Sequence, residues 1–179
     1  MIRPACPADM SALSDFFEDL SVESRYLRFF GPVRPTSSLL NLLSGGPADV
    51  DAVVAAVDGV VIGHAMAADQ TDPADPRGAR VTDVGVVVAD AWQRRGVGAA
   101  LMRALITRAQ ARGVTSLAMD VLPGNRRVIA MITGHWPDAA IGYSPDGLDI
   151  RIQLPRYQPP LPQARLAIQP VRPLVHLGR

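Results

Sequence analysis

The chain lacks lysine entirely, so all 18 of its basic side chains are arginines. It has a single cysteine, Cys6, which excludes an internal disulfide and a cysteine-based metal cluster. The three histidines, His64, His135 and His176, are scattered and do not have the spacing of metal ligands. We therefore expect a protein that holds no metal ion.

Long apolar runs are also missing. No stretch approaches the roughly 20 residues that a membrane-spanning helix needs. Met1 leads directly into Ile2-Arg3-Pro4, without the basic and then apolar segment of a secretion signal. The formal net charge of +1 gives no electrostatic case for binding nucleic acid. These features predict a cytoplasmic protein that has neither a membrane nor a nucleic acid as its partner.

Hydrophobic periodicity predicts the order of the secondary structure. Helices are expected over residues 10–19, 22–30, 97–112 and 125–133, and strands over residues 2–5, 51–57, 60–68, 80–88, 115–121 and 148–154. Residues 32–50 and 69–78 are expected to form loops, and Asp58-Gly59 a two-residue hairpin turn. This order is typical of an α/β or α+β domain with a mixed, mostly antiparallel sheet. We expect this domain to span residues 1–154, followed by a proline-rich extended tail over 155–179.

The strongest motif consists of a valine-rich strand, a short polar loop and a helix that is opened by glycines. The first N–H groups of a helix have no partner within the helix, and the helix dipole makes their position attractive to anions. Gly96 and Gly98 have no side chain to block a phosphate, and Arg94 and Arg95 add positive charge. A pyrophosphate is the expected ligand, although an unliganded helix start with small packing residues is the alternative.

Two other nucleotide motifs are excluded here. The Rossmann fingerprint needs a third glycine where the chain has Leu101, and a Walker loop needs a lysine.

The segment Gln93-Arg94-Arg95-Gly96-Val97-Gly98-Ala99 resembles the Gln/Arg-x-x-Gly-x-Gly/Ala loop of the GNAT acetyltransferases. The element order over roughly residues 1–154 is also similar. The resemblance implies a GNAT fold, with helices flanking a mostly antiparallel sheet that is splayed at the acetyl-CoA site. It implies that acetyl-CoA is the co-substrate. Its pantetheine arm would bind the backbone of Val86, Val87 and Val88, and its pyrophosphate the N–H groups of residues 94–99.

Two further residues fit this resemblance. Gly85 lies within the strand, where a glycine marks a bulge or a close approach of another group; the alternative is that it fits under a large neighbour. Asn125 matches a position where the family often has an asparagine that contacts the coenzyme A arm. It is equally well explained as a helix N-cap.

Acetyl transfer to an amine needs a group that takes the amine proton, and Asp83 is the candidate. It lies ten residues before Gln93 on an otherwise apolar strand, where burial should raise the pKa of its carboxyl. The alternative is a carboxylate bound to a backbone amide or an arginine. Many GNATs have glutamate here, and the shorter aspartate favours a bridging water.

The general acid of the family is usually a tyrosine in the last helix, at the position of Ile132. Residues 125–134 contain no tyrosine. Of the two tyrosines that follow, Tyr143 and Tyr157, we expect Tyr143 to be the better candidate. Alternatively, the thiolate leaves unaided or with a proton from water.

The acceptor is suggested by the segment Leu20-Ser21-Val22-Glu23-Ser24-Arg25-Tyr26-Leu27-Arg28-Phe29-Phe30. It is similar to the Leu-Ser-x-Glu-Ser-x-Tyr-x-Arg-Phe-Phe helix of bacterial protein lysine acetyltransferases. That resemblance implies a protein lysine as acceptor, although shared core packing alone would also explain it. A small amine is the second hypothesis, because the aspartate-rich loop 69–75 would suit an acidic acceptor pocket. A catalytically weak acetyl-CoA-binding module is the third.

Overall fold

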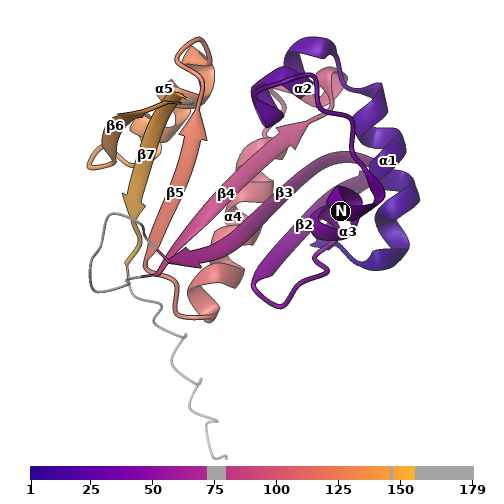
Figure 1. Cartoon of the computed structure of the whole chain (residues 1–179), viewed down its shortest axis with the longest axis horizontal. Coiled ribbons are helices and arrows are strands. Elements are labelled where there is room, and N and C mark those ends of the chain that lie inside the picture. The colour runs from indigo at the N-terminus through magenta and orange to yellow at the C-terminus, as the bar shows by residue number, and fades with distance from the viewer. Residues whose placement is uncertain (72–79, 146, 156–179) are drawn as a thin grey trace, which may run out of the picture.

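The computed structural model describes residues 1–71, 80–145 and 147–155. They form a seven-stranded sheet in the order β1-β2-β3-β4-β5-β7-β6 (Figure 1). The strands are β1 (Ile2–Pro4), β2 (Val50–Val57), β3 (Val60–Thr71), β4 (Arg80–Val88), β5 (Ser116–Val121), β6 (Ala140–Ser144) and β7 (Gly147–Gln153). All pairs of neighbouring strands are antiparallel except β4 and β5, which are parallel. The mixed, mostly antiparallel sheet predicted from the sequence is therefore confirmed.

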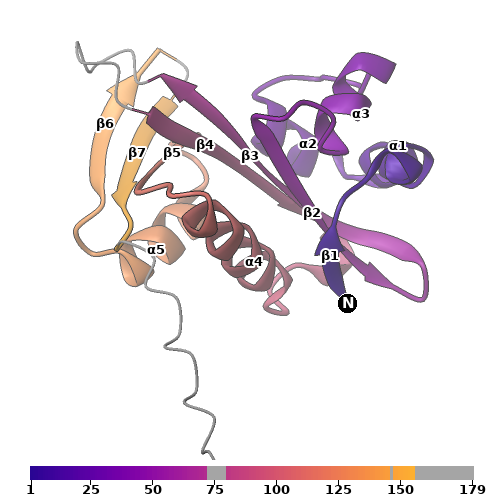
Figure 2. The ribbon, with the colours of Figure 1, turned by 90° about the horizontal axis from the view of Figure 1, so that it is seen from below.

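Helices cover both faces of the sheet (Figure 2). One face carries α1 (Met10–Asp19), α2 (Val22–Phe29) and α3 (Ser37–Leu43), and the other carries α4 (Val97–Ala111) and α5 (Arg126–His135). Phe17 and Leu13 are fully buried between the first three helices and the sheet. Leu101 and Leu105 of α4 are equally buried on the other face. The sheet is thus the middle of three layers, and its two faces have separate cores.

Most predicted elements are confirmed, with small shifts at their ends. Asp58 and Gly59 both have positive φ, at 48° and 82°, as a two-residue hairpin turn requires. Helix α2 ends with Phe30 in the left-handed region at φ 55°, one residue before the glycine that we expected to stop it. Helix α5 continues through Gly134, which was the predicted end.

One α-helix and one strand were not predicted, nor was the short 3-10 helix at Asp90–Trp92. Helix α3 lies in the expected loop 32–50 and begins where Thr36 Oγ1 accepts a hydrogen bond from the Leu39 N–H. Strand β6 is an exposed edge strand. Most of the predicted loop 69–78 and nearly all of the predicted tail 155–179 lie outside the described residues. Within the described part, none of the helices has the length and apolar character needed to cross a bilayer.

The parallel strands β4 and β5 separate shortly after they meet. They pair only at Thr82 with Leu117 and at Asp83 with Ala118, although β4 continues to Val88. Figure 1 shows the two strands diverging toward the end at which α2 lies. The predicted splay of the sheet is present, and within the described part of the chain no strand pairs with this edge of β4 after Asp83.

Candidate functional site

Helix α4 begins at the end of the splayed strand with an open N-terminus. Gly96 has a left-handed backbone with φ 81° and no side chain that caps the helix, and Arg94 is also left-handed at φ 60°. The Ala100 N–H donates to the Gly96 carbonyl at 3.0 Å. Within the described residues, the three N–H groups before Ala100 have no acceptor, so they remain available to an anion.

The surroundings of these N–H groups are accessible and positive. Arg94, Arg95 and Gly96 are exposed. The Arg95 guanidinium carbon lies 4.3 Å from the centre of the Trp92 ring, which holds this cation beside the loop. A methyl group at Gly98 would lie 3.6 Å from a Val88 methyl, an ordinary contact. The helix start therefore sits against the end of β4, and the residues present fit a pyrophosphate.

The unpaired edge of β4 leads from this helix start toward Asp83. The Ala89 N–H donates to the Ile62 carbonyl of β3 at 2.9 Å. Because backbone groups alternate along an antiparallel ladder, the groups of Val87 also face β3, whereas those of Val86 and Val88 face the gap. Of the three valines that we predicted to contact pantetheine, Val86 turns both its backbone groups to the gap. Val88 offers its N–H, because its carbonyl already accepts from Gln93 Nε2 at 3.1 Å. Val87 instead pairs with β3 and buries its side chain in the core.

Gln93 uses its side chain inside the protein. Its Nε2 donates to Ser24 Oγ at 2.9 Å and to the Val88 carbonyl at 3.1 Å. Asp90 accepts hydrogen bonds from Ser24 Oγ at 2.7 Å and from the N–H and Oγ of Ser21 at 3.0 and 2.8 Å. Although burial works in the opposite direction, these hydrogen bonds hold the pKa of Asp90 below its usual range. The loop is thereby tied to the N-terminus of α2, a link that the sequence analysis missed.

Asp83 occupies the last position of β4 that pairs with β5, at the base of the gap. Its carboxyl is half-buried, and burial raises its pKa, with the negative charges of Asp120 and Asp149 acting in the same direction and Arg151 against them. Within the described residues no group donates a hydrogen bond to this carboxylate. The raised pKa and the missing donor fit a group that accepts a proton better than they fit a carboxylate held by a partner.

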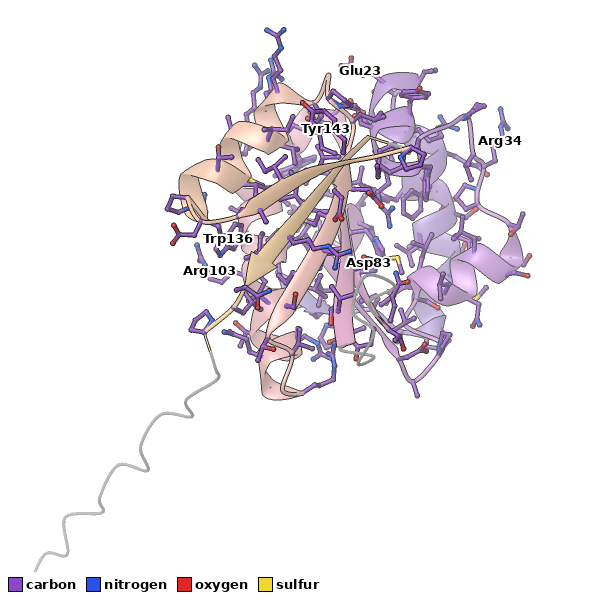
Figure 3. All side chains as sticks on the ribbon, turned by 60° about the vertical axis from the view of Figure 1, so that its left-hand side comes forward. Glu23, Arg34, Asp83, Arg103, Trp136 and Tyr143 are labelled. Atoms are coloured by element: carbon purple, nitrogen blue, oxygen red, sulfur yellow. The ribbon has the colours of Figure 1, made fainter. Side chains whose placement is uncertain are left out.

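Tyr143, the predicted general acid, is not near Asp83. It lies on the edge strand β6 with 90% of its surface exposed. It pairs directly with Leu148, whose side chain packs in the core beside α5, so both lie on the face opposite Asp83. Figure 3 shows the two residues at different heights of the sheet. The structure therefore does not bring the two proposed catalytic residues together.

Asn125 acts as the N-cap of α5, because its Oδ1 accepts a hydrogen bond from the Val128 N–H at 3.4 Å. Ile132, at the position of the family's usual tyrosine, is fully buried. Among the described residues, no cluster of three or more histidine, cysteine or acidic side chains is arranged to hold a metal ion.

Known proteins resemble this chain in sequence and in fold. The model of the acetyltransferase (GNAT) family matches residues 15–133. The acetyltransferase Pat of Mycolicibacterium smegmatis is 27% identical over 152 residues, which cover 83% of this chain and 45% of that protein. The chain thus spans less than half the length of this relative.

Solved structures show the same fold. The GNAT domain of S. lividans PAT superposes with a TM-score of 0.73 at 28% identity, covering 86% of this chain and 89% of that one. A phosphinothricin acetyltransferase from Sinorhizobium meliloti, solved in complex with AcCoA, has a TM-score of 0.65 at 17% identity, covering 86% and 88%. At that identity the second structure supports the fold alone. Because the family model matches well over half of its residues, the chain belongs to the acetyltransferase (GNAT) family.

Proposed function

We propose that the chain transfers the acetyl group of acetyl-CoA to a primary amine, with Asp83 as the general base and a protein lysine side chain as the acceptor. One observation carries this proposal. A carboxyl with a raised pKa lies at the base of a gap whose wall is an unpaired strand edge and whose far end is an open helix N-terminus.

Each part of the gap has a role in the transfer. The N–H groups at the start of α4 bind the pyrophosphate, and the backbone of Val86 and Val88 binds the pantetheine arm. Acetyl-CoA supplies the thioester carbonyl that the amine attacks. Asp83, directly or through a water, takes the proton of the amine as the C–N bond forms and the C–S bond breaks. The departing thiolate takes its proton from water, because Tyr143 is out of reach.

The charges around Asp83 favour a cationic acceptor. Asp120 and Asp149 face each other across β5 and β7, on the same side of the sheet as Asp83. Asp149 is paired with Arg151 at 3.1 Å, so the negative charge that attracts an ammonium group comes mainly from Asp83 and Asp120. The similarity to Pat proteins in sequence and structure supports a protein lysine in particular. A small amine is the second candidate, since the same carboxylates would attract it.

The test compares a peptide that contains one lysine, the same peptide with arginine in its place, and cadaverine. Acetyl transfer from acetyl-CoA is measured for each. The chain contains no lysine, so any acetyl-lysine detected belongs to the acceptor. We expect the highest kcat/KM for the lysine peptide and no transfer to the arginine peptide. Acetylation of cadaverine alone would favour the small-amine function. Tight acetyl-CoA binding without any transfer would contradict both enzyme functions.

A further inference from the structure

Arg28 of α2 places its guanidinium directly on β4, over Gly85. A methyl group at Gly85 would lie 2.6 Å from the guanidinium carbon and 2.7 and 3.0 Å from its two terminal nitrogens. These similar distances show that the flat face of the guanidinium, rather than one edge, lies against the strand. Its N–H bonds therefore point along the surface of the sheet. A side chain at this position would displace the guanidinium from the strand.

Among the residues that the structure describes, this cation has no anionic partner. Within the described residues, no carboxylate forms an ion pair with Arg28 and no acceptor receives a hydrogen bond from its Nε, which is shielded from solvent. The other arginines that approach the sheet differ, since Arg3 pairs with Asp9, and Arg108 and Arg112 pair with Asp51. Burial lowers the pKa of Arg28 to about 10, so it remains charged at neutral pH. Its guanidinium carbon lies 5.0 Å from the centre of the Phe29 ring, so an aromatic face is its neighbour in place of an anion.

The position of this cation relates it to the proposed reaction. Gly85 and Asp83 are two residues apart on one strand, so their side-chain directions point to the same face at a separation of roughly 7 Å. His64, also on this face, is fully buried, and burial together with the charge of Arg28 lowers its pKa to about 3. His64 is therefore neutral and is not an anionic partner of Arg28. The Arg28 guanidinium therefore lies on the same face of β4 as the side chain of Asp83.

We propose that Arg28 binds a carboxylate group that one of the two substrates carries into this gap, and that it thereby determines specificity. A guanidinium binds a carboxylate through two parallel hydrogen bonds, a geometry that the edge of Arg28 offers here. The carboxylate belongs either to the far end of the acyl chain or to the amine acceptor, beside the amine. The location of both substrates in the gap rests on the proposed function.

The experiment measures binding by calorimetry for two matched pairs of compounds. The first pair, succinyl-CoA and acetyl-CoA, differs by a carboxylate on the acyl chain. The second pair, L-lysine and cadaverine, is titrated in the presence of coenzyme A and differs by a carboxylate on the amine. We expect the carboxylate compound to bind at least about tenfold more tightly than its partner in one pair, which identifies the source.

Three variants test whether Arg28 causes this preference. Arg28→Met should abolish the preference for the carboxylate compound without weakening the binding of the carboxylate-free compound. Arg28→Lys should keep part of the preference. Arg25→Met is the matched control, because Arg25 lies on the same helix and donates to the carbonyls of Glu18 and Leu20 instead. The melting temperature of Arg28→Met should not fall, since the variant removes a cation that has no anionic partner among the described residues and whose Nε is buried without an acceptor.

The inference is overturned if the wild type shows no preference in either pair, or if Arg28→Met keeps the preference. A lower melting temperature of Arg28→Met with an unchanged preference would assign the residue a structural role alone. Since binding is measured, the result stands even if no acceptor is acetylated, a finding that would count against the proposed function only.

Discussion

At the scale of single residues, the surroundings of Asp83 determine how readily its carboxylate takes up a proton. An aspartate on an exposed strand is ionised at neutral pH and a weak base. Burial at the base of the gap and the charge of Asp120 raise the pKa of Asp83, which brings it toward the range that proton transfer requires. The same residue thus becomes a better base because neighbouring strands carry negative charge.

Replacing Asp83 by asparagine removes the proposed base and should lower kcat by roughly 10²- to 10⁴-fold without weakening acetyl-CoA binding. The base is active only when ionised, so the wild-type rate should fall as the pH drops through its raised pKa. This acid limb should be absent in Asp83→Asn. The measurement is a pH profile of kcat/KM.

The matched control is Asp120→Asn. It removes a negative charge that raises the pKa of Asp83, so it should retain turnover while the acid limb moves to lower pH. If kcat/KM fell at the same acidic pH in Asp83→Asn as in the wild type, Asp83 would be ruled out as the titrating base.

At the scale of elements, α2 and the loop before α4 form one hydrogen-bonded unit. Ser24 is buried and donates to Asp90 while it accepts from Gln93. One element carries Arg28, for which we propose a role in substrate specificity, and the other leads to the helix start at which we propose that the pyrophosphate binds. We expect the positions of the two substrates to be coupled through this unit.

Ser24→Ala should break this unit, since it leaves Gln93 without its serine acceptor and Asp90 with one donor fewer. Loss of such hydrogen bonds costs about 1–3 kcal/mol, and we expect the Kd of acetyl-CoA and the KM of the acceptor to rise together. Ser38→Ala, at an exposed position of α3, is the control and should change neither value. A rise in only one of the two values would contradict the coupling.

The sequence predicted the elements that have strong periodicity and clear end signals, including the strand, loop and helix around Gln93. It did not predict α3, because seven residues are too few for a periodic pattern to stand out from a loop. The role of Asp90 was also missed, since its partners lie almost 70 residues away in the chain. Likewise, the sequence alone could not place Tyr143 on a face of the sheet, because strand pairing decides the face on which a side chain lies.

At the scale of the whole molecule, the core between the sheet and α1–α3 contains one neutral histidine. His64 is fully buried and its Nε2–H donates to the Leu43 carbonyl at 2.8 Å. Its pKa of about 3 in the folded protein lies well below the ordinary value of 6.5. The unfolded chain therefore binds a proton below pH 6.5 that the folded protein excludes, so acid favours unfolding.

The free energy of unfolding should consequently fall as the pH drops from 7 to 5, by roughly 2 kcal/mol from this one group. His64→Gln, which retains an N–H donor and does not titrate, should lack this part of the decrease. Urea unfolding of both proteins at the two pH values measures the difference. An equal decrease in the variant would show that His64 is not the group responsible.

The most direct test of the account concerns the open start of α4. Gly98→Asp places a carboxylate in the first turn, where it stabilises a free helix by about 0.3–1 kcal/mol but repels a pyrophosphate. Ser38→Asp makes the same change at the corresponding position of α3 and is the control. The account predicts that Gly98→Asp melts no lower than the wild type and binds acetyl-CoA at least about 100-fold more weakly, while Ser38→Asp binds it normally. Acetyl-CoA binding by Gly98→Asp with the wild-type Kd would contradict the central claim.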